Sequence, residues 1–401
     1  MKRVAVTGLG AISAGGATAQ ATWEAVREGR SGIGPIACGR CEDLRVPVAA
    51  HVRDFDPTAH FSSRRMAMYD RFSQFAVIAS REAFADAKLS AEDPAVRLAP
   101  LIIGVGVGGL ETLDDAFYNL YSEGQRRLHP LTVPRLMMNA APSLISMDLG
   151  LKGMTYAIAS ACASGTHAIG TAFHMVRGGG AQVAITGGTE ACIFFGPMLA
   201  WEALRVLSHD DCRPFSRNRS GLVIGEGAAT LVLEEWDRAV ARGAHIYAEM
   251  VGFGGNADAG DITSMDKENA AEAMRLAMRD GGLVPGDIDY INAHGTGTTM
   301  NDKLESAAIH LAFDGAAPPP ISSSKGVLGH TLGAAGALEA LVACKALEEQ
   351  IIPPTANCTD PEIELGVDMV PEGPRSAAID VCLSNSFAFG GLNAVLALRR
   401  A

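Results

Sequence analysis

Two stretches of the chain, far apart in the sequence, follow the same plan. Residues 158–173 read IASACASGTHAIGTAF, and residues 321–341 read ISSSKGVLGHTLGAAGALEAL. Each begins with an isoleucine-led strand, continues through a polar turn and enters a helix of small residues. We interpret the repeat as an internal duplication of an α/β unit, with two halves, residues 1–250 and 251–401, that meet face to face.

The turns after the predicted strands carry chemically distinct residues. Cys162, His294 and Phe389 lie in three of them, and His330 shares a fourth with Lys325. Because ligands of α/β folds gather at the carboxyl ends of strands, we expect these turns to converge. Cys162 would stand at a helix N-terminus, where free N–H groups and the helix dipole favour the thiolate, a nucleophile. Each residue also has an ordinary alternative: a small buried cysteine, turn-capping or core histidines, or a solvated lysine.

The composition narrows the class of protein. With 401 residues, 48% hydrophobic side chains and 45 glycines, the chain suits one compact globular body. The net charge of −12 argues against a nucleic-acid binder. Glycines interrupt the apolar segment near the N-terminus, and no apolar run approaches the roughly 20 residues of a membrane span. Eight cysteines without regular spacing favour a reducing compartment, so we expect a cytoplasmic protein.

Two short motifs have competing interpretations. Gly104, Gly106 and Gly109 satisfy the GxGxxG pattern of dinucleotide-binding proteins. No acidic residue ends a clear second strand about 20 positions later, which favours a tight strand-to-helix turn lining a pocket. Cys38 and Cys41 form a lone CxxC without histidines at ligand spacing, which favours two ordinary loop thiols over a zinc or redox site.

Hydrophobic periodicity also predicts the main regular elements. The predicted helices span residues 62–88, 131–149, where Pro134 opens the helix, and 333–350. Two buried strands with a glycine bend are expected within residues 222–235, and a last strand pair is expected around residues 385–391.

Four ordered blocks of the sequence carry a family resemblance. SACASG surrounds Cys162, NAHGTGT surrounds His294, SSSKGVLGH ends at His330, and NSFAFGG lies near the C-terminus. Together they resemble the signature blocks of the β-ketoacyl-acyl-carrier-protein synthases, most closely the elongating branch with a Cys-His-His site. The resemblance extends to ketosynthases of nodulation-factor, aryl-polyene and aromatic-polyketide pathways. It implies an α/β fold of the thiolase-like type, with five αβαβα layers built from two duplicated halves, and a protein that dimerises.

The resemblance also implies a reaction and a role for each motif residue. Cys162 would accept an acyl chain from carrier-protein phosphopantetheine as a thioester, before a decarboxylative Claisen condensation with malonyl-acyl-carrier protein. The N–H groups of Cys162 and Phe389 would form the oxyanion hole, and His294 and His330 would donate hydrogen bonds to the malonyl thioester as it becomes an enolate. The other implied site residues are two supporting charges, Lys325 and Glu339, two pantetheine contacts, Thr296 and Thr298, and an acyl pocket lined by Val107 and gated by Phe389.

The implied partners are an acyl carrier protein and a second subunit. That subunit would be a copy of this chain or a related ketosynthase or chain-length-factor chain. The substrates would arrive on 4′-phosphopantetheine, with no permanently bound cofactor and no metal. We expect local basic residues to dock the carrier protein despite the acidic total; the candidates are Arg64, Arg65, Arg126, Arg127 and Arg205. Beside the gate, Ala388 and Leu392 depart from the family's GFGGTN loop and leave gating open.

Two alternatives keep the fold but not the condensing activity. A degradative thiolase would use a second cysteine in a C-terminal CxGGG loop, whereas this chain has NSFAFGG there and a second histidine after Lys325. A non-catalytic chain-length partner subunit should lack the nucleophile, and Cys162 is present. Both features favour the condensing enzyme.

Overall fold

The strands of the two halves form one continuous ten-stranded sheet. The computed structural model describes residues 1–401, and the strand order is β10-β9-β13-β14-β8-β1-β7-β6-β4-β5. The strands of the first half are β1 (Val4–Ser13), β4 (Leu101–Val105), β5 (Thr155–Ile158), β6 (Val183–Glu190) and β7 (Gly227–Glu235). Those of the second half are β8 (Ala248–Ala257), β9 (Tyr290–Asn292), β10 (Ile321–Ser322), β13 (Val381–Ala388) and β14 (Leu392–Arg399). The halves join where Val4–Val6 of β1 pairs antiparallel with β8.

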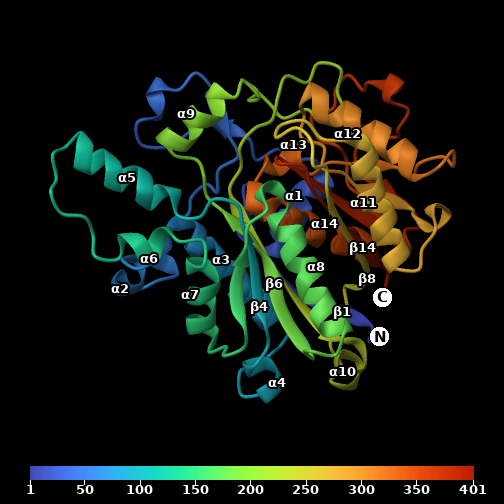
Figure 1. The fold of residues 1–401 in the computed structure, drawn as a ribbon, viewed down its shortest axis with the longest axis horizontal. Helices are drawn as coiled ribbons and strands as arrows, with labels where there is room; N and C mark the ends of the chain where they lie inside the picture. The colour runs from blue at the N-terminus through green and yellow to red at the C-terminus, as the bar shows by residue number, and fades with distance from the viewer.

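Three layers of helices alternate with the two halves of the sheet (Figure 1). α3 and α7 cover the outer face of the first half, α8 and α14 lie between the halves, and α11 and α12 cover the outer face of the second. Their bounds are α3 (Arg71–Asp86), α7 (Ala140–Leu149), α8 (Ser164–Arg177), α14 (Ala335–Glu349), α11 (Lys267–Asp280) and α12 (Thr299–Ala312). This arrangement confirms the predicted five-layered αβαβα fold.

Small residues allow the two central helices to cross closely. Every residue from Ala335 to Leu347 of α14 is buried. A Cβ added to Gly336 would lie 1.9 Å from Thr166 Oγ1, and one added to Gly165 would lie 2.9 Å from Ala337 N. Real Cβ contacts are longer than this, so glycine at both positions is what permits the crossing. The crossing brings the N-termini of α8 and α14, and the turns that precede them, together at the centre of the molecule.

The remaining elements are short or peripheral. They are α1 (Ala19–Glu28), α2 (Ser63–Met66), α4 (Pro94–Arg97), α5 (Leu110–Tyr121), α6 (Thr132–Leu136), α9 (Phe195–Ala203), α10 (Trp236–Ala241), α13 (Lys325–Leu328), β2 (Gly34–Pro35), β3 (Val48–Ala49), β11 (Ile351–Ile352) and β12 (Arg375–Ser376). The predicted boundary between the halves, at residue 250, falls inside β8. No helix has both the length and the apolar character that crossing a membrane requires.

Two predicted long helices are each broken into two. The predicted helix 62–88 is wrong, because the chain bends between α2 and α3 at Asp70, whose carboxylate caps α3 by accepting from Phe72 N and also accepts from Thr112 N at 2.9 Å. The predicted helix 131–149 divides into α6 and α7 at Met137, which is extended with ψ 139°. In both cases hydrophobic spacing continues across the break, so periodicity alone does not reveal it.

Two further predictions need correction. Within residues 222–235 only Gly227–Glu235 form a strand, β7, while Leu222, Ile224 and Gly225 make only isolated bridges. Cys38 and Cys41 are paired as a disulfide, with their Cα atoms 5.4 Å apart, rather than lying apart as two free thiols. The left-handed backbone of Arg40, with φ 66°, folds this loop back on itself. The other six cysteines are free and buried.

Candidate active site

Cys162 lies in a tight turn between β5 and α8. The chain forms a single 3-10 turn over Ala161–Ala163 and enters α8 at Ser164. Ala161 has a φ of 50°, a conformation that costs a non-glycine residue about 1–2 kcal/mol. Ser164 Oγ stabilises the turn by accepting from Ser160 N at 2.9 Å and donating to Ala161 O at 2.7 Å. The turn places Cys162 at the N-terminus of α8, as the sequence predicts.

Burial opposes ionisation of the Cys162 thiol. The residue is 5% exposed, and this burial raises the pKa of the thiol to about 11, against the lowering effects of the Lys325 ammonium and of the backbone N–H groups of Phe389 and Cys162. The expected thiolate is therefore corrected to a resting thiol, because desolvation outweighs the helix terminus. The backbone N–H groups of Phe389 and Cys162 are among the groups that lower the pKa of this thiol, so both lie near the sulfur; their role as an oxyanion hole remains a prediction.

His330 faces the cysteine from the second half of the fold. Its Nε2 lies 3.1 Å from Cys162 Sγ, and its Nδ1 accepts a hydrogen bond from Leu332 N at 3.3 Å. Burial first, and then the Lys325 charge, lower the pKa of His330 well below its ordinary value, so the ring is neutral. An imidazole that accepts at Nδ1 carries its proton on Nε2. The backbone thus assigns His330 a donor that points toward Cys162.

A buried lysine determines which ring nitrogen of the second histidine carries the proton. Lys325 Nζ lies 3.4 Å from His294 Nδ1, donates to His294 O at 2.6 Å and pairs with Glu339. Lys325 and Glu339 are each 1% exposed, so neither is a solvated surface charge. Burial and Lys325 lower the pKa of His294 well below its ordinary value. Because an ammonium can only donate, His294 accepts at Nδ1 and also carries its proton on Nε2. The two imidazole rings are 5.4 Å apart and nearly perpendicular.

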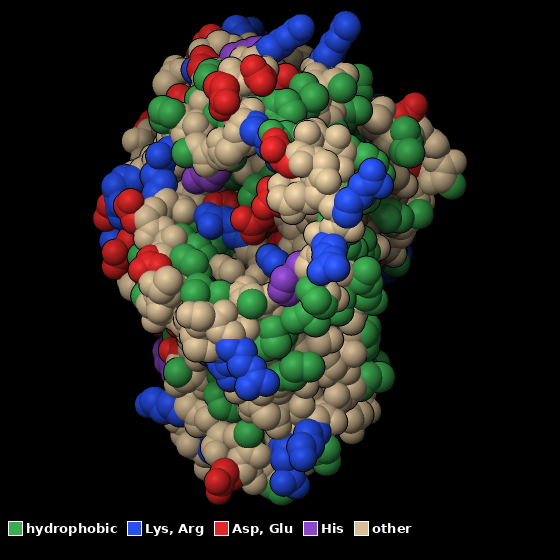
Figure 2. All heavy atoms as spheres, turned by 90° about the vertical axis from the view of Figure 1, so that its left-hand side faces the viewer, with side chains coloured by type: hydrophobic (Ala, Val, Ile, Leu, Met, Phe, Trp, Pro, Cys, Tyr) green, Lys and Arg blue, Asp and Glu red, His purple; other side chains and the backbone are tan.

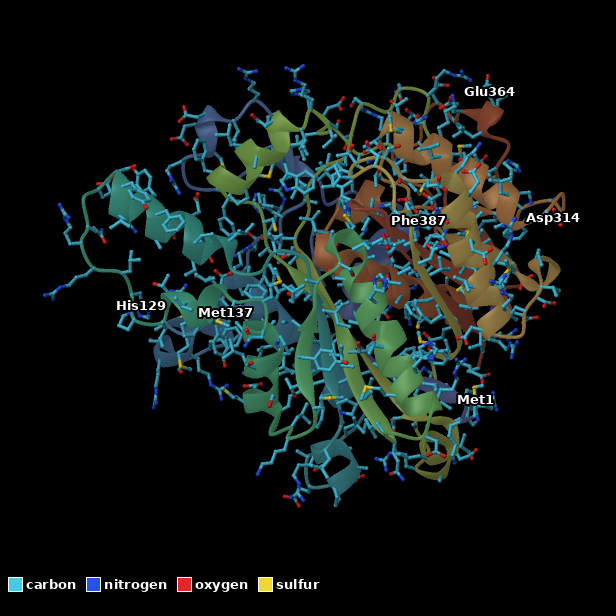
Figure 3. All side chains as sticks on the ribbon, viewed as in Figure 1. Met1, His129, Met137, Asp314, Glu364 and Phe387 are labelled. Carbon is cyan, nitrogen blue, oxygen red and sulfur yellow. A yellow bond between two sulfur atoms is a disulfide. The ribbon has the colours of Figure 1, made fainter.

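These side chains line a cavity of about 290 Å³. Cys162, His294 and His330 share it with Thr296 and Thr298, and its other lining residues are Trp201, Leu204, Val206, Leu222, Thr263, Met265, Met300, Asn301, Leu304, Phe387, Ala388 and Phe389. The ring of Phe387, labelled within the second half in Figure 3, packs edge-on against His294 at 6.2 Å. The apolar lining surrounds a small group of convergent donors, which is typical of a site that binds an acyl chain or a thioester arm.

The loop beside Phe389 is held from two directions. The Phe389 ring stacks on Trp201, with centroids 6.1 Å apart, and Gly390 N donates to Ile262 O at 2.7 Å. Gly390 and Gly391 have positive φ angles of 85° and 67°, whereas Ala388 lies in β13 opposite Leu392. The replacement of glycine by alanine at position 388 therefore falls on an extended residue, and the conformational freedom of the loop resides in the two glycines.

The sequence matches known families over most of its length. The family described as "Beta-ketoacyl synthase, N-terminal domain" matches residues 1–239, and "Beta-ketoacyl synthase, C-terminal domain" matches residues 247–359. The chain belongs to the β-ketoacyl synthase family. This membership and the NSFAFGG loop, which contains no cysteine, exclude the degradative thiolase alternative.

Relatives of this synthase cover its whole length. Nodulation protein E of a Rhizobium species is 42% identical over 400 residues, which is 100% of this chain and 99% of the relative. The 3-oxoacyl-[acyl-carrier-protein] synthase 2 of a Synechocystis species is 42% identical over 408 residues, covering 100% of this chain and 98% of the relative. These matches show a synthase of the second, elongating type.

Two solved structures have the same fold as this synthase. The ishigamide ketosynthase/chain length factor superimposes with a TM-score of 0.95 at 34% identity, over 100% of this chain and 99% of that chain. A type II PKS acyl-carrier protein in complex with its ketosynthase, AntDE:AntF, gives a TM-score of 0.89 at 28% identity, with both chains covered at 100%. The fold of the synthase is therefore that of the thiolase-like ketosynthases.

The GxGxxG stretch forms the turn between β4 and α5. The carboxylate of Glu190 fills this turn, accepting from Gly106 N at 2.7 Å and Gly108 N at 3.2 Å. An anion of the protein itself thus lies where a dinucleotide phosphate would bind, which favours the tight-turn interpretation. Val107, in the same turn, is 41% exposed and does not line the cavity that contains Cys162. Its assignment to the acyl pocket remains a prediction that requires a second subunit to cover it.

The five predicted docking arginines differ in the exposure and the ion pairing of their side chains. Arg65 pairs with Asp148 at 2.5 Å. Arg64, Arg126, Arg127 and Arg205 are exposed, and Arg205 lines a surface hollow with Arg45 and His209. Their role in carrier-protein docking remains a prediction, and Arg65 is the least available of the five.

Several site residues escaped the sequence analysis. Glu305 accepts from His294 N at 2.8 Å and Gly295 N at 2.7 Å, holding the NAHGTGT turn. Trp201 supports Phe389, and Leu332 N sets the tautomer of His330. Glu305 is a charged residue on the buried face of α12, and a charge at such a position could have indicated a functional role from the sequence. The contacts of Trp201 and Leu332 depend on tertiary structure, so the sequence contained no indication of them.

Proposed function

We propose that this synthase catalyses the decarboxylative Claisen condensation of an acyl chain, held as a thioester on Cys162, with malonyl-acyl-carrier protein. The observation that carries the proposal is the convergence of two neutral histidines, both with Nε2 protons, on the cavity at Cys162. Two fixed neutral donors suit an enolate, whose negative charge develops only during the reaction.

Acyl transfer comes first. Cys162 attacks the thioester carbonyl of the incoming acyl-carrier protein, the C–S bond to phosphopantetheine breaks, and the thiol proton of Cys162 ends on the departing pantetheine sulfur. The backbone N–H groups of Cys162 and Phe389 stabilise the oxygen of the tetrahedral intermediate; their proximity to the sulfur, seen in their effect on the pKa of the thiol, supports this role. Thr296 and Thr298, at the cavity wall, hold the pantetheine arm.

Condensation follows when malonyl-acyl-carrier protein replaces the free carrier. The bond to the malonyl carboxylate breaks, CO₂ leaves, and the electron pair forms an enolate whose oxygen accepts from His294 and His330 Nε2. The enolate carbon attacks the acyl group on Cys162, a C–C bond forms, and the cysteine sulfur leaves and takes up a proton. Lys325, paired with Glu339, keeps His294 neutral and oriented throughout.

Intact-protein mass spectrometry tests the proposal. The purified synthase is incubated with a panel of acyl-carrier proteins, and an adduct of each acyl mass on Cys162 is expected. Cys162→Ala must abolish the adduct. If the wild-type protein forms no acyl adduct with any carrier substrate, or if the adduct persists in Cys162→Ala, the nucleophile assignment is wrong. The preferred acyl mass also distinguishes fatty-acid, polyene, polyketide and nodulation-type substrates.

A second subunit is proposed to cover the face formed by α5, α6 and the edge strand β5. Figure 2 views this side of the molecule, where hydrophobic side chains spread below a polar hollow. The exposed hydrophobic residues of this segment include Phe117, Tyr121, Leu128, Val133 and Met137. In Figure 3, His129 and Met137 mark how far it projects from the body. Exposed apolar surface beside an unpaired sheet edge favours an interface.

Light scattering distinguishes a copy of this chain from a related partner. Twice the chain mass for the purified protein supports a homodimer, whereas a single-chain mass that doubles only on co-expression with a chain-length-factor chain supports a heterodimer. A monomer under both conditions would contradict the interface.

We also propose a cytoplasmic location, which rests on the six free buried cysteines.

A further inference from the structure

A buried carboxylate outside the Cys-His-His site connects two turns of the synthase. Glu190, the last residue of β6, is 0% exposed. Its Oε2 accepts from Gly106 N at 2.7 Å and from Gly333 N at 3.2 Å. Its Oε1 accepts from Gly108 N at 3.2 Å, and Val107 N lies 3.2 and 3.3 Å from the two oxygens. One side chain thus holds a turn of the first half against a turn of the second.

Both turns carry parts of the proposed reaction. Gly333 directly follows Leu332, whose N–H donates to His330 Nδ1 and leaves the proton of His330 on Nε2. The other turn carries Val107, the predicted acyl-pocket residue. The packing between the turns has no slack, since a Cβ on Gly333 would lie 2.3 Å from Gly106 N and 2.7 Å from Glu190 Oε2. A movement of either turn is therefore transmitted to the other.

The charge of Glu190 is balanced by backbone N–H groups. Burial raises the pKa of its carboxyl to about 7, and the N–H groups of the two turns act in the opposite direction. The surrounding elements carry Cys192, Asp70, Glu111, the neutral His330, and Glu226 paired with Arg71. The main influences on the pKa of Glu190 are burial and the backbone N–H groups, and none of them is a cation. Burying a carboxylate without partners costs free energy. The carboxylate of Glu190 offsets this cost by accepting hydrogen bonds from several backbone N–H groups at once.

We propose that Glu190 is a positioning residue for the condensation, whose carboxylate holds the turn that orients His330 against the turn that carries Val107. The proposal rests on the proposed function of the Cys162 site. When Glu190 is ionised, both oxygens accept from the turns; in the neutral form a proton occupies one oxygen and leaves backbone N–H groups without an acceptor. Malonyl decarboxylation, which needs His330, then slows. Acyl transfer, which uses the N–H groups of Cys162 and Phe389, changes little.

The test measures the two half-reactions separately in Glu190→Gln. Acyl transfer is followed by the mass of acyl-Cys162 in single-turnover experiments, and decarboxylation by labelled CO₂ released from malonyl-acyl-carrier protein. Decarboxylation is expected to fall about 10- to 100-fold, as for other residues that orient a reacting group, while acyl transfer changes less than about threefold. Wild-type decarboxylation should decline as the pH falls below about 7, where both the Glu190 and the Glu305 carboxyls take up protons because burial raises the pKa of each to about 7. Glu190→Gln should be slow and should keep only the part of this decline that Glu305 causes.

Glu226→Gln is the matched control, because Glu226 is a second buried carboxylate, 1% exposed, that pairs with Arg71 and lies outside the cavity. It should lower thermal stability without changing the ratio of the half-reactions or the acid decline. Equal loss of both half-reactions in Glu190→Gln, or retention of the wild-type decarboxylation rate, overturns the proposal.

A variant that fails to fold does not prevent a decision. If Glu190→Gln does not fold, a Glu190→Asp variant that keeps the wild-type rate of decarboxylation overturns the proposal. Glu190→Asp, which keeps the charge but shortens the reach, should be slow and retain the acid decline. Failure of the wild-type protein to form acyl-Cys162 would instead reject the proposed function, so the two failures are distinguishable.

Discussion

The turns at Cys162 and Gly333 are the same backbone structure used for different purposes. Each is a single 3-10 turn that opens a long buried helix, Ala161–Ala163 before α8 and Leu332–Ala334 before α14. Each begins with a non-glycine residue at positive φ, 50° at Ala161 and 47° at Leu332. The following position is Cys162 in one turn and Gly333 in the other. The duplication inferred from the sequence therefore extends to an unfavourable backbone conformation.

The difference between the turns underlies the proposed division of the two-step reaction. The first turn has space for a side chain, which projects into the cavity. At the second, a Cβ would meet Gly106 N and Glu190 Oε2, so the position is restricted to glycine, and the turn orients His330 instead. In the proposed mechanism, one turn holds the acyl group, and the other directs the donor that acts on the malonyl group.

Removing either histidine donor should give the largest effect on the reaction. His330→Ala and His294→Ala are each expected to slow malonyl decarboxylation by about 10²- to 10³-fold, the usual effect of losing a donor to a developing oxyanion, while acyl transfer to Cys162 largely survives. Labelled CO₂ release and acyl-enzyme mass report the two steps. His310→Ala, on the exposed face of α12, is the control. Equal loss of both steps would remove the proposed division between the two turns.

The pKa of Cys162 gives a prediction for the turn that would carry the acyl group. Because burial raises this pKa from 9.0 to about 11, the thiolate fraction at pH 8 should be roughly 100-fold below that of an unperturbed thiol. Alkylation of Cys162 by iodoacetamide, followed by mass spectrometry, should accelerate about tenfold per pH unit up to about pH 11. The position of the plateau, rather than the absolute rate, is diagnostic, since burial also limits access. A plateau below pH 9 would show that the helix terminus dominates over burial.

Gly333→Ala tests whether the second turn can accept a side chain. The added Cβ would lie 2.3 Å from Gly106 N and 2.9 Å from Val105 C, and overpacking against backbone typically costs about 1–3 kcal/mol. The free energy of unfolding in denaturant should fall by this amount. Gly286→Ala, where a Cβ would meet nothing within 4 Å, should be near neutral. Unchanged stability in Gly333→Ala would mean that the second turn, like the first, has space for a side chain.

The smallest effect is expected at the residue before the nucleophile. Glycine at position 161 would relieve the cost of positive φ, about 1–2 kcal/mol, but would also lose about 0.5–1 kcal/mol to a more flexible unfolded chain. Ala161→Gly should therefore raise the free energy of unfolding by about 1.5 kcal/mol at most, measured by chemical denaturation, and leave acyl transfer intact. Leu332→Gly also removes a buried side chain, 4% exposed, and should destabilise the protein instead.

The sequence by itself determined the duplication and the residues that meet in the cavity. These features follow from local patterns: alternating strands and helices, small residues in two helices, and reactive residues in short motifs after strands. Cys162, His294, His330 and Lys325 were all found in this way, and the structure brings them together. The five-layered class followed from the resemblance of the motifs to the β-ketoacyl synthases. The helix breaks at Asp70 and Met137 were missed, because hydrophobic spacing continues through both.

Only the tertiary structure decided the state and setting of these groups. Burial makes Cys162 a resting thiol and both histidines neutral, and burial is a property of the packed core rather than of any short motif. Glu190 reaches a turn 84 residues earlier, and Gly333 reaches the same carboxylate from the other half. Such contacts depend on how strands and helices are placed in space, which local sequence patterns do not encode.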